Sequence, residues 1–435
     1  MGERIGEDGM SVVENHAMNE VPSSERKGWM NVASIWAGSL ICVPILLIGG
    51  ALTSGLSLMQ SLLAGVIGFL IVIAYMAFQG MQGTDLGRPT VMNAQSAFGT
   101  VGAGIFISFV LGVALVGWFG VQVGVTGAAF SSLLAGMGAE FPVAWSTLLW
   151  GIIMVSTAII GYRALSYLNY IAVPALILLC VFGVTAAINE YGVQGLVALE
   201  PVSPFSLFQG IAMVVGGFAV GAAIAADYSR YNVNRRQSVL SIVVGVLPFG
   251  VLLLLAGSIM AAVAGTADIT EAVASMGMPA LGLAILILAT WTTNVVNAYS
   301  GGLALTSLFR LKDNKRALTT AVAGGLGTLL ALGGILNHFI AFLTILTAGI
   351  CPLAGVMIAD YWIKRKGRKE RWTPVPGINW AGFAAWLIAS VVSYFVAWGI
   401  PAVNGIVAAI LLYLLFDALL IKKTDEVPNT IGQEG

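Results

Sequence analysis

The chain has 435 residues, of which 58% are hydrophobic and only 9% are charged, and its mean hydropathy is +0.93. A soluble domain could not keep this much apolar surface away from water, so a soluble fold is excluded and lipid is the expected solvent. The formal net charge of +0 gives no sign of a nucleic acid or another polyanion as a partner.

Long stretches without a charged residue, beginning with 28–84, each hold one or two runs of about 20 apolar residues, the length that crosses a bilayer core. Because a backbone in lipid must satisfy its own hydrogen bonds, these runs are predicted to be α-helices. The predicted spans are 32–56, 60–80, 101–131, 144–162, 168–188, 206–228, 238–265, 278–304, 317–334, 338–362, 379–398 and 401–421. The expected fold class is an all-α polytopic membrane protein with 12 transmembrane helices.

The charges separate between the two sides of this arrangement. With the first helix running outward, all 20 Lys and Arg residues lie on the inner side. The outer loops carry only acidic charges, at Glu140, Glu190, Glu200, Asp268 and Glu271. This positive-inside pattern predicts a cell inner-membrane protein with both termini in the cytoplasm. Polar residues 1–25 and 424–435 are expected to be disordered cytoplasmic tails around a transporter domain at 26–423.

Two of the spans contain residues that disturb a helix. A transporter needs irregular backbone at mid-membrane depth, where freed N–H and C=O groups can hold a ligand or an ion. The first span has Gly38, Ser39 and Pro44 near its middle, and the sixth has a Gly-rich run at 215–223. They are five helices apart, as the matching broken helices of two inverted repeats would be. The alternative is that these small residues only permit close helix packing.

The eighth span is the richest in polar side chains, with Thr290, Thr292, Thr293, Asn294 and Asn297 in eight residues. Their oxygens could bind a dehydrated cation such as Na⁺, and an amide could bind the polar edge of a ligand. The same groups could instead bond to their own helix or to a neighbouring helix. Ionisable residues are missing from the centres of the predicted spans, which favours Na⁺ over protons as the coupling ion.

The third span offers a surface for a planar ligand. Trp118 is flanked by Gly117 and Gly120, and Gln122 follows one turn later on the same helical face. A flat ring could stack on the exposed indole. A membrane Trp is also commonly a packing residue or an interface anchor, and that alternative stays open.

Four blocks of sequence together resemble a known family. They are Val-Gly-Trp-Phe-Gly-Val at 116–121, Ala-Asp-Tyr-Ser-Arg at 226–230, Trp-Thr-Thr-Asn at 291–294 and Ala-Gly-Val-Met-Ile-Ala-Asp-Tyr at 354–361. From Arg26 to about Lys423 the chain is similar to the nucleobase–cation symporter-1 family, the purine/cytosine permease family, and especially to its bacterial cytosine permeases. The resemblance implies a LeuT-like fold with alternating access. Its 5+5 inverted repeats would be at about 29–190 and 203–363, with two extra helices at 378–421.

The resemblance also implies two binding sites. A Na⁺ site would use carbonyl groups near Ser39 and Cys42, the Ala289 carbonyl and the hydroxyls of Thr292 and Thr293. A substrate would lie between Trp118 and Phe218, and its polar edge would be bound by the backbone of Gly217 and Gly221 and by Asn294. Na⁺ would be the coupling ion, and no other cofactor is expected. The sequence shows no P-loop, HExxH or GxSxG motif, so neither an ATP-driven pump nor an intramembrane enzyme is expected.

Departures from the cytosine permeases leave the substrate open. The chain has Leu115 where they have Gln, and Val295 where they have an acidic residue. Gln122 and Gly217 match hydantoin permeases of the same family, and Asn297 lies within one residue of their second Asn. One candidate substrate is cytosine or a related pyrimidine or purine. The other is a hydantoin-, allantoin- or other ureide-like ring.

The expected partners are a small heterocycle, Na⁺ and the lipid bilayer, with no nucleic acid, and a monomer is expected to be functional. A proton-coupled symporter or passive facilitator of the same fold, and a membrane scaffold or sensor, are the competing functions. Asp227 and Asp360, at predicted cytoplasmic helix ends beside basic residues, are expected to form ordinary solvated ion pairs rather than gates.

Overall fold

The structure is a computed structural model that describes residues 20–160, 162–201, 203–275, 277, 279–396 and 398–425. The predicted tails at 1–25 and 424–435 therefore lie largely outside the described residues. Within those residues the long elements are all helices, and the strand-like pairing is one isolated bridge between Lys27 and Asn232.

The main helices are α1 Trp29–Leu40, α2 Val43–Thr53, α3 Leu58–Leu86, α4 Thr90–Asn93, α5 Gln95–Phe98, α6 Thr100–Gly136, α7 Val143–Ile160, α8 Tyr162–Val197, α9 Leu207–Ala223, α10 Ala225–Ser229, α11 Arg235–Ala264, α12 Ile269–Ala274, α13 Pro279–Leu308, α14 Arg316–Leu332, α15 Phe339–Ile358, α16 Trp380–Phe395 and α17 Pro401–Asp425. Short helical turns are η1 Ser23–Glu25, η2 Asp313–Lys315, η3 Ile335–His338, η4 Ala359–Lys364 and η5 Lys369–Arg371, of which η4 is π-helical.

Among the described residues, 7 helices are long and apolar enough to cross a membrane, and α1 with α2 forms an eighth, broken span. The helices α7, α9, α14 and α16 are shorter and apolar. These eight spans and four shorter helices fall on the twelve apolar segments that the sequence predicts. The prediction of an all-helical polytopic membrane protein is confirmed, although α3 and α8 extend well beyond their predicted bounds.

The first span is broken where its composition predicts. Helices α1 and α2 meet at a bend of 55°. Ile41 (φ −78°, ψ 76°) and Cys42 (φ −148°, ψ 156°) leave the helical conformation between them. Pro44 lies in the first turn of α2, where its missing N–H has no intrahelical partner to lose.

The sixth span differs from the prediction. Helix α9 is continuous through Gly216, Gly217 and Gly221, and the interruption comes later, at Ile224 (φ −90°, ψ 18°), before α10. The Gly-rich run serves close packing instead. A Cβ on Gly216 would stand 2.3 Å from the backbone oxygen of Leu343 in α15. Packing against neighbouring helices therefore accounts for Gly216 and for Gly217, over which Ile48 of α2 lies, whereas Gly221 faces the Phe218 ring of its own helix.

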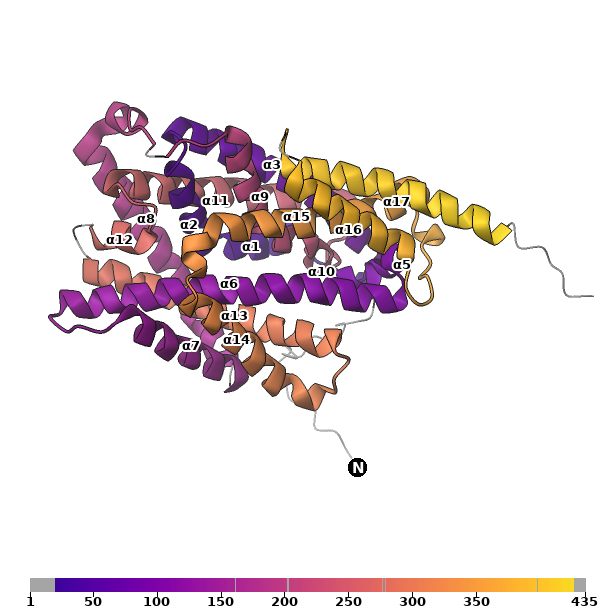
Figure 1. Cartoon of the computed structure of the whole chain (residues 1–435), viewed down its shortest axis with the longest axis horizontal. Coiled ribbons are helices and arrows are strands. Elements are labelled where there is room, and N and C mark those ends of the chain that lie inside the picture. The colour runs from indigo at the N-terminus through magenta and orange to yellow at the C-terminus, as the bar shows by residue number, and fades with distance from the viewer. Residues whose placement is uncertain are drawn as a thin grey trace, which may run out of the picture.

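The helices form two groups with α15 between them. In one group α11 packs against α1, α2 and α3, and α9 packs against α3. In the other, the long helix α6 runs beside α13, and α7 and α14 cover this pair (Figure 1). Helix α15 contacts both α9 and α6, and the last two helices, α16 and α17, lie side by side (Figure 1).

Two glycines allow α2 and α11 to touch through their backbones. A Cβ on Gly49 would stand 2.1 Å from the carbonyl oxygen of Leu254, and one on Gly257 would stand 2.3 Å from that of Leu46. The Ser258 hydroxyl also donates to the Gly49 carbonyl at 2.9 Å. Real Cβ atoms do not approach this closely, so any side chain at these positions must separate the helices.

We expect Gly49→Ala to lower the stability of the protein by about 1–3 kcal/mol, because the added methyl group overlaps backbone atoms that cannot rotate away. Thermal unfolding of the purified protein measures the effect. Gly325→Ala in α14 is the matched control, because a Cβ there would meet no atom within 4 Å. Equal stability of the two variants would contradict this account of the α2–α11 contact.

Candidate functional site

Helix α15 lies between the helices that carry the predicted aromatic residues, Trp118 of α6 and Phe218 of α9. The ring of Phe342 lies 5.3 Å from that of Trp118, at 81°. The next residue, Leu343, presents its backbone oxygen to Gly216 of α9. Trp118 and Phe218 therefore lie on helices that contact adjacent residues of α15. Both rings are buried, with 6% and 8% of their surface exposed.

Both halves of the broken first span reach the same part of α9. Trp36 of α1 contacts the Phe218 ring at 6.5 Å and 79°. Ile48 of α2 fills the space over Gly217, where a Cβ would stand 2.1 Å from its Cδ1 atom. The Phe218 ring also covers Gly221, one turn further along α9. The break thus lies beside the α9 residues that the family resemblance implies for the substrate site.

The polar residues of the predicted substrate site differ in what they bind. Asn294 is fully buried, and its Nδ2 atom donates to the Phe119 carbonyl of α6 at 3.1 Å. Its Oδ1 atom accepts a hydrogen bond from Asn297 Nδ2, also at 3.1 Å. Gln122 is 1% exposed, and its Oε1 atom has no hydrogen-bond partner among the described residues. Gln122 is therefore the predicted site residue with an open buried acceptor.

Leu115 lies one turn before Trp118 in α6. Its Cβ atom is 3.7 Å from the position that a Cβ of Gly301 would take in α13. Leu115 and Trp118 share a helical face by their spacing of three residues. The α13 contact leaves Leu115 half-buried.

The five residues of the predicted cation site lie in two groups. On α13 the hydroxyls of Thr292 and Thr293 both donate to the Ala289 carbonyl, the former at 3.2 Å. At the break, Ser39 is exposed at the end of α1 and Cys42 is buried at the start of α2. The break leaves carbonyl groups in the last turn of α1 without intrahelical donors. In the described part of the chain, no hydrogen bond joins these two groups.

Two cavities open at the end of the bundle that carries Glu200 and Asp268. The larger, of about 670 Å³, is lined by residues of α2, α6, α9 and α15, including Val125 and Phe339. Phe339 also contacts the Trp118 ring at 6.1 Å, so this cavity lies one side chain away from Trp118, although the predicted substrate residues are not among those that line it.

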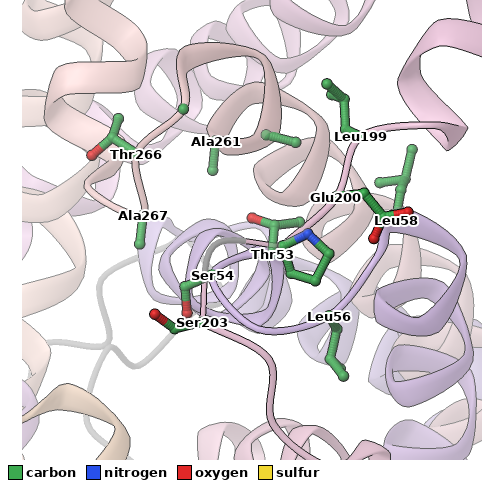
Figure 2. A pocket seen from close by; sticks show the side chains of 13 residues that line it. Thr53, Ser54, Leu56, Leu58, Leu199, Glu200, Ser203, Ala261, Thr266 and Ala267 are labelled. Carbon is green, nitrogen blue, oxygen red and sulfur yellow. The ribbon is translucent and has the colours of Figure 1, made fainter.

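The smaller cavity, of about 390 Å³, lies between the ends of α2 and α11 and the loop before α9. Figure 2 shows Thr53, Ser54 and Glu200 around it. The predicted substrate and cation residues are not among those that line this cavity. It is therefore a feature separate from the candidate site.

At the opposite end of the bundle, the structure corrects the prediction for Asp360. This residue is fully buried in the π-helical turn η4 rather than part of a solvated ion pair. Its carboxylate accepts hydrogen bonds from Ser96 at 2.5 Å, Tyr413 at 2.8 Å and Arg365 at 3.0 Å. The three donors come from α5, α17 and the segment after η4. These hydrogen bonds join the end of α15 to α5 and α17.

Tyr361, the residue after Asp360, joins the same end of α15 to α3 and α11. The Tyr361 hydroxyl donates to Asp85 at the end of α3, at 2.7 Å, and Arg235 of α11 binds the same carboxylate through Nε and a terminal nitrogen at 2.8 and 2.6 Å. Asp227 is half-buried and accepts a hydrogen bond from the backbone N–H of Thr90 at 2.6 Å. It too belongs to the packed structure.

The sequence analysis did not predict two features of the structure. One is that α15 packs between α6 and α9, and the other is that Asp360 is buried. Phe342 and Leu343 lie in an apolar helix and carry no chemical signal. Asp360 belongs to a block that the resemblance singled out, and a carboxylate at the end of an apolar segment is a signal that could have indicated a buried site.

The fold and these residues define a polytopic membrane transporter, with a broken span beside buried aromatic and amide side chains. A family described as "Permease for cytosine/purines, uracil, thiamine, allantoin" matches residues 20–418. The chain is 31% identical over 418 residues to the cytosine permease of Escherichia coli (strain K12), which covers 95% of this chain and 97% of that protein. It is 27% identical to the hydantoin permease of Microbacterium maritypicum, over 89% of this chain and 85% of that one. The solved structure of Mhp1 in an inward-facing conformation superposes with a TM-score of 0.82 at 23% identity, covering 96% of each chain.

The chain belongs to this permease family, the nucleobase–cation symporter-1 family that the sequence blocks resemble. Its fold is LeuT-like, and it is a transporter and not an enzyme.

We expect Asp360→Asn to destabilise the protein by about 3–5 kcal/mol, because it leaves the mostly buried Arg365 charge without its partner. The control is Asp417→Asn, whose ion pair with Lys364 is more exposed, at 17% and 30% for the two side chains. That variant should lose less than about 1 kcal/mol. Chemical or thermal unfolding measures both, and an Asp360→Asn variant as stable as the control would contradict the assigned burial.

Proposed function

We propose that this protein is a secondary active transporter that imports a nucleobase together with Na⁺ by alternating access. The observation that carries the proposal is the unpaired, buried Oε1 atom of Gln122, one turn from Trp118. An unsatisfied buried acceptor costs about 1–3 kcal/mol, and a ring N–H of a bound heterocycle would relieve that cost. Buried aromatic rings at Trp118 and Phe218 suit a flat ligand.

Sodium coupling is supported by the chemistry of the oxygens on α13 and at the break. The Ala289 carbonyl and the hydroxyls of Thr292 and Thr293 already lie together. Free carbonyl groups at the end of α1, including that of Ser39, would complete a set of neutral oxygen ligands. A hard monovalent cation binds such oxygens without requiring a buried carboxylate. Proton coupling and passive facilitation are the alternatives within the same fold.

The exposed face of α1 supports a water-filled passage on one side of the site. Asn31, Ser34, Ile35, Gly38 and Ser39 are exposed at helical spacing, while Trp36 on the opposite face is buried. A lipid-facing stripe would be rich in Leu, Ile and Val, whereas this one is mostly small and polar. Arg26 and Lys27 directly precede α1, so by the positive-inside pattern we assign this end to the cytoplasmic half of the pathway. This agrees with the proposed cytoplasmic termini and inner-membrane location.

For the substrate, we favour cytosine or a related pyrimidine or purine. The 31% identity over nearly the full length of a cytosine permease supports it. A hydantoin- or allantoin-like ring is the second candidate, because Gln122 and Gly217 match the residues of hydantoin permeases and Leu115 departs from the cytosine permeases. Both classes are flat rings with adjacent N–H and C=O groups, which a glutamine amide can bind.

We expect one or more of cytosine, uracil, hypoxanthine, hydantoin and allantoin to bind the purified protein more tightly in NaCl than in choline chloride. Because the cation and the ring would occupy adjoining groups, each should raise the affinity of the other. Trp fluorescence or thermal-shift titration measures the effect. Binding without any difference between the two salts would refute Na⁺ coupling, and the ring that binds identifies the substrate class.

The double variant Thr292→Ala with Thr293→Ala should retain the fold and lose the Na⁺ dependence of uptake, because both proposed hydroxyl ligands are removed. Uptake into proteoliposomes with and without a Na⁺ gradient measures this. Thr185→Ala is a control, since that exposed hydroxyl donates to its own helix at Val181. Unchanged Na⁺ dependence in the double variant would remove α13 from the cation site.

A further inference from the structure

Two buried polar contacts join α6 to α13 inside the membrane. The hydroxyls of Thr126 and Thr290 lie 2.7 Å apart, and both residues are fully buried. The second contact is the hydrogen bond from Asn294 Nδ2 to the Phe119 carbonyl. The two helices run antiparallel, since Gly112 faces Ala304 at one end of the contact and Thr126 meets Thr290 at the other.

Each contact is next to residues of both proposed sites. The Thr126 hydroxyl also lies 2.8 Å from the carbonyl of Gln122, the residue with the open acceptor. Thr290 directly follows Ala289, whose carbonyl is shared by the proposed cation ligands. Thr290 itself lies 2.8 Å from the Leu286 carbonyl of its own helix. Each hydroxyl has one proton, so Thr126 donates to Thr290 and Thr290 donates to a carbonyl of its own helix, that of Leu286 or Ile287. A hydrogen-bonded link thus runs from α6, one turn after Gln122, to the α13 backbone just before Ala289.

We infer that Thr126 and Thr290 are positioning residues that couple the substrate residues of α6 to the cation residues of α13. The inference rests on the function proposed above. A hydroxyl pair in a dry interface has no water to replace its hydrogen bond, so it holds the two helices in one register. A cation bound at Ala289 and Thr293 fixes that segment of α13. Through Thr290 and Thr126 the same register fixes the Gln122 amide.

The structure contains a matched pair for comparison. Thr306 of α13 and Thr319 of α14 also lie with their hydroxyls 2.7 Å apart and are buried. This pair joins α13 to a different helix, far along the chain from Ala289 and Gln122. It has the same chemistry and is also buried, at 8% and 5% exposed, and no proposed ligand lies beside it. Its loss should weaken packing without affecting communication between the two sites.

The experiment measures the ratio of the Kd in choline chloride to the Kd in NaCl, with cytosine as the probe, or hydantoin where cytosine does not bind. The full-length wild type, Thr126→Val, Thr290→Val and the double variant are compared with Thr306→Val. In the Thr126 and Thr290 variants we expect the ratio to fall by about fivefold, as a lost buried hydrogen bond implies. Thr126→Ser should restore it, and Thr306→Val should keep the wild-type ratio.

The double variant removes both hydroxyls and leaves no unpaired group, so it should fold even where a single variant does not. A wild-type ratio in the double variant would overturn the inference and leave Na⁺ coupling standing. An equal fall in Thr306→Val would also overturn it, because general loosening of α13 would then be the cause. A wild-type protein whose ratio is one would refute the proposed Na⁺ coupling itself, and with it the inference.

Discussion

The backbone of this protein must satisfy its hydrogen bonds without help from water, and the rest of the structure depends on that constraint. Almost every apolar segment meets it by forming an unbroken helix. The sharpest exception, at Ile41 and Cys42, frees carbonyl groups in the middle of a span, and such a break persists only where the freed groups are surrounded by protein or line a pathway. It lies beside Gly217 and Phe218 of α9. The candidate site thus lies beside the one described span whose helices bend sharply apart.

Small residues decide how closely the helices around this break can approach. Gly49 and Gly257 let α2 and α11 touch through their backbones, and Gly216 does the same for α9 and α15. In lipid there is little hydrophobic gain from bringing helices together, so close van der Waals contact and buried hydrogen bonds must stabilise the bundle. The Thr126–Thr290 and Thr306–Thr319 pairs serve this second purpose on α13. The same helix carries the proposed cation ligands, so its packing and its function are closely linked.

Asp85 and Asp360, at the end of the bundle opposite Glu200 and Asp268, are subject to a different constraint. A buried charge is tolerated only when its partners satisfy it, and Asp360 has three donors from separate parts of the chain. Tyr361, the next residue, binds Asp85 on the opposite side. The end of α15 is therefore attached to both groups of helices, while its other half contacts Trp118 through Phe339 and Phe342. Because α15 contacts both groups of helices, a movement of one group relative to the other would shift Phe339 and Phe342 against Trp118.

The sequence by itself determined the membrane class, the number and approximate position of the helices and the broken first span, because apolar length and local Gly and Pro content are properties of neighbouring residues. It also identified the family through short blocks such as Trp291-Thr-Thr-Asn294. Only the tertiary structure decided what these residues contact. The Gly-rich run of α9 packs as continuous helix, Asn294 binds Phe119 while Gln122 stays open, and Asp360 is buried. Those outcomes depend on contacts between segments far apart in the chain, which local sequence patterns do not specify.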